Sequence, residues 1–149
     1  MSFLKRAMLL LAEDYDDRFA GLLLCQADGK FLLVRRSEHE NRAGQWEQPG
    51  GHVREEDAND LAAAVREAIE ELGGLPKKVS VLYEGVRQIP NGKGVYTTVV
   101  AVTEPGDWEP KLSDGHDAWG WFDIKSFPEA THPGVYETIN NLLEEKKAA

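Results

Sequence analysis

Three glutamates near the middle of the chain have a spacing that is often found among side chains that act on anionic substrates. Glu67, Glu70 and Glu71 occupy positions i, i+3 and i+4 of the segment REAIEELG at 66–73. On an α-helix these positions share one face, so three carboxylates would lie close together. Like charges at this spacing repel one another unless a cation lies between them. Because all the donors are oxygen atoms, a hard ion, Mg²⁺ or Mn²⁺, is expected rather than zinc.

The flanking sequence predicts a helix over residues 58–72 that buries another face. Asp57 or Asn59 is expected to cap its start, and Gly73-Gly74 is typical of a helix end. An acidic helix face is often merely solvated surface. Here the glycine turn before the helix and Arg66 beside the first glutamate favour a functional site. The predicted buried positions share an apolar character: Leu61, Val65, Ala68 and Leu72.

This segment resembles the Nudix box, G-x5-E-x7-R-E-U-x-E-E-x-G-U, in which U is apolar. The second half matches from Arg66 to Gly73. Counted from Gly51, the acid position falls on Asp57, and eight residues rather than seven separate Asp57 from Arg66. A one-residue insertion in the loop accounts for this difference, since loops tolerate length changes best. We predict that Asp57 and Arg66 still meet.

The resemblance extends beyond the box, to about residues 18–143. QWEQPGG at 45–51 resembles the W-x-x-P-G-G approach common in the family, and HDAWGWF at 116–122 resembles its later H-x-x-x-x-W-F strand. The resemblance implies an α/β/α sandwich, in which a mixed sheet lies between helices. We expect a single Nudix hydrolase domain over residues 1–149.

The order of elements expected from the residues agrees with that architecture. Asp28-Gly29 predicts a two-residue hairpin between the first two strands, and Pro133 opens a second helix. The expected strands span 19–26, 30–35, 79–89, 95–102 and 119–124. The second helix has an apolar face formed by Val135, Ile139, Leu142 and Leu143.

The resemblance also implies roles for the residues of the box. Glu70 and Glu71 match the paired metal carboxylates, and Glu67 binds a further metal or acts as general base. Arg66 matches the arginine that orients the carboxylates. The Gly50 carbonyl is a candidate backbone ligand, because glycine permits close approach of the chain to an ion. The candidate catalytic residues are therefore Glu67, Arg66 and Glu70.

Many family members take another carboxylate from a later loop. Six residues before Trp121, where that acid often stands, this chain has Gly115. Asp114 is the candidate additional acid, and Asp57 is a second one. As part of Ser-Asp-Gly, Asp114 is also typical of an ordinary turn. Weaker substitutes are Glu104 and Glu109.

Substrate contacts are harder to assign from the sequence. Arg35 and Arg36, at the end of the second strand, are weak candidates for phosphate contacts. His116 is a candidate for substrate contact, although a structural or surface role is the simpler interpretation. Several side chains could stack or contact phosphate but are equally typical of the core, and none is assigned as a ligand: Tyr83, Arg87, Tyr96, Trp119 and Trp121.

Composition limits the classes of partner. The chain has 149 residues, 42% of them hydrophobic, which suits one globular domain. A formal net charge of −9 argues against a general nucleic-acid or membrane-surface binder. The single Cys25 cannot form an internal disulfide, so we expect a buried thiol and a reducing, cytoplasmic location. The apolar stretch 7–12 is too short for a membrane span; an edge element, a short helix and a homodimer contact remain open for it.

The leading hypothesis is a metal-dependent pyrophosphohydrolase that acts on a nucleoside diphosphate linked to another moiety. We expect a nucleoside triphosphate, including oxidised forms, as the small-molecule substrate. The alternatives are ADP-ribose or another nucleotide sugar, and dinucleoside polyphosphates. A non-enzymatic nucleotide sensor is a further alternative, against which the complete set of glutamates argues. Diphosphate isomerisation is disfavoured by the short chain and by the apparently structural Cys25.

Overall fold

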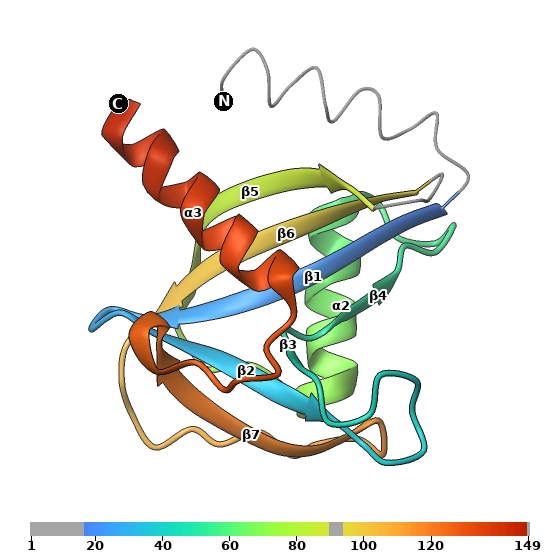
Figure 1. Cartoon of the computed structure of the whole chain (residues 1–149). Helices are drawn as coiled ribbons and strands as arrows, with labels where there is room; N and C mark the ends of the chain where they lie inside the picture. The colour runs from blue at the N-terminus through green and yellow to red at the C-terminus, as the bar shows by residue number, and fades with distance from the viewer. Residues whose placement is uncertain (1–16, 90–93, 149) are drawn as a thin grey trace.

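A mixed seven-stranded sheet forms the centre of the protein (Figure 1). The computed structural model describes residues 17–89 and 94–148. The strand order is β3-β2-β1-β6-β5, while β4 pairs with β1 and β7 pairs with β2. β1 and β6 are parallel, and the other strand pairs are antiparallel. The strands are β1 (Asp17–Gln26), β2 (Lys30–Arg36), β3 (Trp46–Glu47), β4 (Gly50–His52), β5 (Val79–Gln88), β6 (Gly94–Thr103) and β7 (His116–Asp123).

Two helices cover the two faces of the sheet, α2 (Asp60–Leu72) on one and α3 (Pro133–Ala148) on the other. Side chains alternate along β1, so that Leu22 and Leu24 face α2 while Leu23 faces α3. A short 3₁₀ turn, η1 (Ile124–Ser126), follows β7. The predicted α/β/α sandwich is therefore confirmed.

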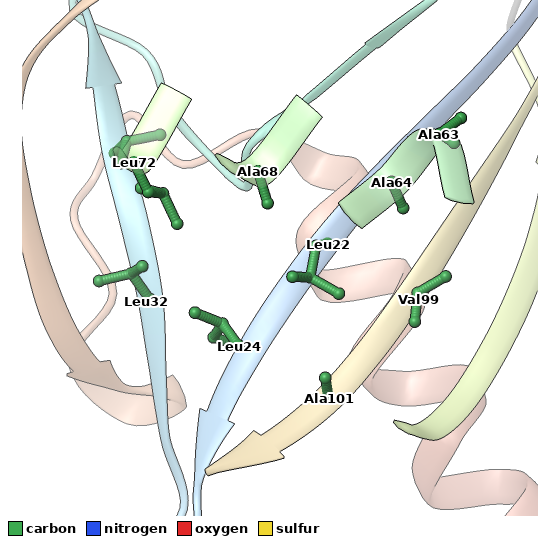
Figure 2. Packing of buried hydrophobic residues seen from close by; sticks show 11 residues of the cluster. Leu22, Leu24, Leu32, Ala63, Ala64, Ala68, Leu72, Val99 and Ala101 are labelled. Atoms are coloured by element: carbon green, nitrogen blue, oxygen red, sulfur yellow. The ribbon is translucent and has the colours of Figure 1, made fainter. Parts of the chain in front are cut away.

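Small side chains bring α2 close to the sheet. Ala63, Ala64 and Ala68 are fully buried against Leu22 and the other apolar residues of that face (Figure 2). Because alanine adds only one carbon beyond the backbone, the helix axis can lie near the strands. This closeness matters for the site, since α2 also packs against β4.

Parts of the predicted packing are wrong. On α2, Leu61 and Val65 are only half-buried, whereas Glu67 belongs to the buried set. The carboxylates therefore do not all lie opposite the core, because the helix turns its alanine stripe, which continues through Glu67, to the sheet. On α3, Val135, Ile139 and Leu142 are buried as expected. Leu143 is 49% exposed, since it lies beyond the edge of that stripe.

The expected strands and the first hairpin are present. Gly29 adopts φ +93°, and its N–H donates to the Gln26 carbonyl at 2.8 Å, which closes the turn between β1 and β2. Cys25 is half-buried rather than fully buried and packs against the α3 side of the core. Residues 7–12 and the turn at 90–93 lie outside the described residues, so the homodimer expectation stays a prediction. In the described ranges, no helix has the length and apolar character needed to cross a bilayer.

Candidate functional site

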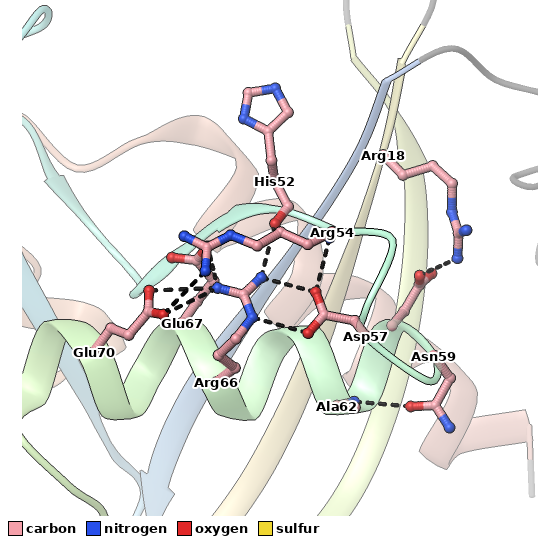
Figure 3. Close-up of polar contacts among 10 residues, drawn as sticks. Arg18, His52, Arg54, Asp57, Asn59, Ala62, Arg66, Glu67 and Glu70 are labelled. Carbon is pink, nitrogen blue, oxygen red and sulfur yellow. Dashed lines mark hydrogen bonds and ion pairs between the residues drawn. The ribbon is translucent and has the colours of Figure 1, made fainter.

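The loop before α2 is held by Arg66 in spite of its extra residue. Asn59 caps the helix, because its Oδ1 accepts a hydrogen bond from the Ala62 N–H at 2.8 Å. Asp57 is thereby left for Arg66, whose Nε and Nη2 donate to its two carboxylate oxygens at 2.8 Å each (Figure 3). The predicted contact between Asp57 and Arg66 is therefore present. Arg66 also donates to the His52 carbonyl at 3.1 Å, which joins the helix to the end of β4.

The same guanidinium contacts two of the three glutamates. Arg66 Nη1 lies 3.0 Å from Glu67 Oε1 and 3.3 Å from Glu70 Oε1. Arg54 approaches Glu70 at 3.4 Å as well, and that carboxylate is 45% exposed. Hydrogen bonds from Arg66 and from the Arg54 backbone lower the pKa of Asp57 to about 2. Arg66 thus offsets much of the repulsion on this face.

Glu71 lies in a different environment from Glu67 and Glu70. Its Oε2 accepts a hydrogen bond from the Gly50 N–H at 2.7 Å, and no arginine is paired with it among the described residues. Burial, together with the negative charge of Glu67, raises the pKa of Glu71 to about 8. Glu71 is therefore the carboxylate that most lacks a counter-charge.

A buried histidine extends the site to β3. The His116 side chain is 3% exposed, and its Nε2 lies 3.0 Å from Glu47 Oε2, while its Nδ1 lies 3.8 Å from Glu71 Oε1. Arg36 also pairs with Glu47, at 3.1 Å. Burial alone would raise the pKa of Glu47, but the hydrogen bond with His116 and the charge of Arg36 lower it. We did not predict Glu47, although it stands within the glycine-rich approach segment.

The site fits a hard cation by the chemistry of its donors. In the part of the chain that the structure describes, no three His, Cys, Asp or Glu side chains converge as a metal site. Glu67 and Glu70 turn toward Arg66, and Glu71 turns toward Gly50. The high pKa of Glu71 marks a buried oxygen donor without a compensating positive charge. A divalent cation accepted between these carboxylates would supply that charge.

The candidate acid Asp114 and the candidate arginines Arg35 and Arg36 lie in different surroundings. Asp114 is exposed, and its backbone carbonyl accepts from Ser37 Oγ at 2.6 Å. A Cβ added at Gly115 would lie 3.6 Å from Glu40 Oε1. Arg35 pairs with Asp117 at 2.7 Å, and Arg36 pairs with Glu47.

A pocket of about 650 Å³ opens beside the glycine turn. Gly50 and Gly51 form one part of its wall, where Gly51 lies so near Glu67 that a Cβ would come within 2.7 Å of its carboxylate. Arg36 lines this pocket and Arg35 does not. Further lining residues come from β1, β5, β6 and α3 and from the loops beside them: Phe19, Arg42, Arg87, Ile89, Tyr96, His132–Val135 and Glu137.

The family model of the NUDIX domain matches residues 15–142 of this chain. The chain belongs to the Nudix family of hydrolases. One curated relative, the CTP pyrophosphohydrolase of Escherichia coli (strain K12), is 46% identical over 50 residues. That match covers 34% of this chain and only 36% of the relative's length.

Solved structures of Nudix proteins share the fold. A MutT NUDIX hydrolase from Burkholderia pseudomallei superposes with a TM-score of 0.62 at 24% identity, over 83% of this chain and 95% of that one. An Ap4A hydrolase from C. elegans superposes with a TM-score of 0.66 at 21% identity, over 87% of this chain and 96% of that one. At such identities these likenesses establish the fold.

The bidentate contact between Asp57 and Arg66 leads to a test by double-mutant cycle. We expect the effects of Asp57→Asn and Arg66→Gln on the free energy of unfolding to be strongly non-additive, because each variant removes the same pair of hydrogen bonds. Urea unfolding of the four proteins measures this coupling. Arg54→Gln is the matched control, since its side chain bonds Glu70 and not Asp57. Additive effects for Asp57 and Arg66 would show that the contact is absent in solution.

The raised pKa of Glu71 predicts a pH dependence of the metal-free protein. Its folded-state pKa of about 8 lies above the ordinary value of 4.5, so the folded state binds the proton more tightly than the unfolded state. This contribution to stability is complete below about pH 4.5 and is lost as the pH rises toward 8. Glu71→Gln should flatten that part of the profile, measured by urea unfolding in EDTA. Glu70→Gln, at an exposed position, should retain it; equal profiles for wild type and Glu71→Gln would contradict the assignment.

Proposed function

We propose that this protein hydrolyses a nucleoside diphosphate linked to another moiety, with Mg²⁺ or Mn²⁺ as cofactor. The observation that supports this most directly is the position of Gly50 and Gly51. They form a wall of the pocket and also contact Glu71 and Glu67, so a bound phosphate chain would lie beside the carboxylates. Family membership supports the reaction class, and the geometry supports the place where the reaction occurs.

Each residue of the box has a part in this proposal. Glu67, Glu70, Glu71 and the Gly50 carbonyl would hold the cation. When bound, the cation screens the phosphate charge and lowers the pKa of water at the reacting phosphorus. Arg66 holds Glu67 and Glu70 in place through its contacts with them.

The reaction requires a proton acceptor, and we assign that role to Glu67. Water attacks a phosphorus atom while Glu67 accepts its proton, and the phosphoanhydride oxygen leaves with a nucleoside phosphate or its partner. Glu67 is buried beside Gly51, at the pocket wall, whereas Asp114 is exposed on the later loop. His116 of β7, which pairs with Glu47 of β3, approaches Glu71 to 3.8 Å.

For the substrate, we propose a nucleoside triphosphate, including oxidised forms. The local similarity to a CTP pyrophosphohydrolase supports this class. Nucleotide sugars such as ADP-ribose and dinucleoside polyphosphates are the alternatives, and an Ap4A hydrolase shares the fold. We propose a cytoplasmic location because the single Cys25 has no internal disulfide partner.

A substrate panel tests the proposal. Purified protein is incubated with triphosphates, nucleotide sugars and dinucleoside polyphosphates, first with Mg²⁺ and then with Mn²⁺, and the products are separated by chromatography. We expect cation-dependent cleavage of a phosphoanhydride bond. Tight binding of nucleotides without any cleavage would instead support a sensor.

The carboxylates proposed to hold the cation can be tested singly. Glu70→Gln and Glu71→Gln should each lower turnover by at least ~10², because removing one electrostatic contact at a reacting centre typically costs a few kcal/mol. Both variants should fold, since each removes one of several repelling charges. Glu129→Gln, an exposed glutamate outside the pocket, is the matched control. Near wild-type turnover at saturating Mg²⁺ in either site variant would refute its ligand role.

The general base is tested by comparing Glu67 with Asp114. Glu67→Gln should lower kcat by ~10²–10⁴ with little change in KM, because a general base acts in the transition state. Asp114→Asn should lower kcat less than ~10-fold, well below the usual cost of losing a general base. A collapse of kcat in Asp114→Asn together with a mild effect in Glu67→Gln would assign the base to the later loop.

A further inference from the structure

Arg87 lies in the pocket wall in a fixed orientation. It stands opposite Tyr96 in the pairing of β5 with β6, and its guanidinium carbon lies 4.8 Å from the centre of the Tyr96 ring. The guanidinium also contacts the start of α3. A Cβ added at Gly134 would lie 2.5 Å from Arg87 Nη2 and 2.8 Å from Cζ. An aromatic ring and a bare glycine backbone therefore hold the flat guanidinium group.

This guanidinium has no anionic partner within residues 17–89 and 94–148. Arg87 Nε is buried and lacks a hydrogen-bond partner there. The ion pairs found in the same ranges involve other cations: Arg18, Arg35, Arg36, Arg54, Arg66, His116 and Lys147. Since Arg87 lines the pocket and its charge has no ion-pair partner in those ranges, a ligand in the pocket could supply acceptors to the guanidinium.

Arg87 and Arg42 are the cations that act on His132 in this part of the pocket, and Arg42 is exposed whereas Arg87 is half-buried. Burial and the charges of Arg87 and Arg42 lower the pKa of His132, which favours its neutral form. His132 Nδ1 already accepts from the Gly134 N–H at 2.8 Å. The carboxylates Glu67 and Glu71 lie beside Gly51 and Gly50, which line the same pocket. Tyr96 lies between, because its ring packs on Arg87 and its hydroxyl lies close to Gly50. A nucleotide with its phosphates beside these glycines could therefore place its base next to Arg87.

We propose that Arg87 determines which nucleobase this enzyme accepts, by donating two hydrogen bonds to adjacent acceptors on the edge of the base. This inference rests on the proposed function, since it takes the pocket to hold a nucleotide. Guanine presents O6 and N7 side by side, and cytosine presents O2 and N3. The adenine acceptors N1 and N7 and the uracil acceptors O2 and O4 each lie next to an N–H donor, which opposes a group that can only donate. The expected substrates are therefore guanine or cytosine nucleotides.

Two variants remove the contact in different ways. Arg87→Gln replaces the guanidinium fork. Gly134→Ala keeps Arg87 but places a methyl group where its guanidinium now lies, so that the flexible arginine must move. Because alanine is favoured over glycine within helices, Gly134→Ala should fold at least as well as wild type. Lys125→Gln, which removes one positive charge outside the pocket, is the matched control.

The experiment measures base preference in both binding and catalysis. Calorimetry gives the affinities of GMP, CMP, AMP and UMP, and kcat/KM with Mg²⁺ is determined for the four triphosphates. We expect guanine or cytosine to be preferred by ~5- to 150-fold, the discrimination typical of one bidentate arginine contact. In Arg87→Gln and Gly134→Ala the preference should fall toward equality, mainly through KM. Lys125→Gln should retain it.

The outcomes separate this inference from the proposed function. Selective binding of GMP or CMP that both variants abolish supports the inference even if no triphosphate is cleaved, and in that case the hydrolase proposal alone fails. Equal affinities for all four bases in the wild type would overturn it. A preference that survives in both variants would also overturn it, and would leave Arg87 with only a packing role against Tyr96.

Discussion

The arrangement of the site depends on the charge of one guanidinium group. Arg66 joins the loop before α2, the end of β4 and the acidic face of the helix, through Asp57, the His52 carbonyl and two glutamates. Without this positive charge, Arg54 would still approach Glu70, but Glu67 would lie against the backbone of β4 without its arginine partner. Arg66 forms no ion pair with Glu71, whose carboxylate instead accepts a hydrogen bond from the neutral Gly50 N–H.

This uneven distribution of charge gives the three glutamates different properties. Glu70 is solvated, and Glu67 is buried but paired with Arg66. Glu71 is largely buried, with His116 at 3.8 Å and no arginine within ion-pair distance among residues 17–89 and 94–148. From helical spacing alone, the three carboxylates would be expected to have similar surroundings. Their different surroundings arise from the sheet, because Gly51 and Gly50 of β4 lie beside Glu67 and Glu71, whereas His116 of β7 lies near Glu71. One acidic motif can therefore supply both a proton acceptor and ligands for a cation.

Much of this arrangement could be predicted from the sequence, because local patterns determine it. The segment that contains Glu67 and Glu70 resembles a known motif, and the contact of Asp57 with Arg66 follows from that resemblance even with an inserted residue. Strands and helices followed from periodicity and from turn residues such as Gly29. The element order then indicated the layers of the fold.

The remaining features depend on contacts between distant residues. Glu47 and His116 are 69 positions apart, and they meet because β3 and β7 both pair with β2 near Arg36. No spacing rule relates such residues before the sheet register is known. Likewise, helical periodicity placed Val65 on the buried face, but the short alanine side chains allowed a closer packing in which Glu67 is buried and Val65 is only half-buried.

The parallel pairing of β1 with β6 has a consequence for how the protein folds. This pairing runs from Asp17 opposite Gly94 to Gln26 opposite Thr103. The chain between β1 and β6, which includes α2, must therefore be closed into one long loop before the two strands can pair. Such long-range pairing is slow to form, because the loss of chain entropy precedes the gain of contacts. Since β4 and α2 both pack on β1, we expect the carboxylates and the glycine turn to come together late in folding. A newly made chain would then acquire its capacity to bind nucleotide only as the central strands close.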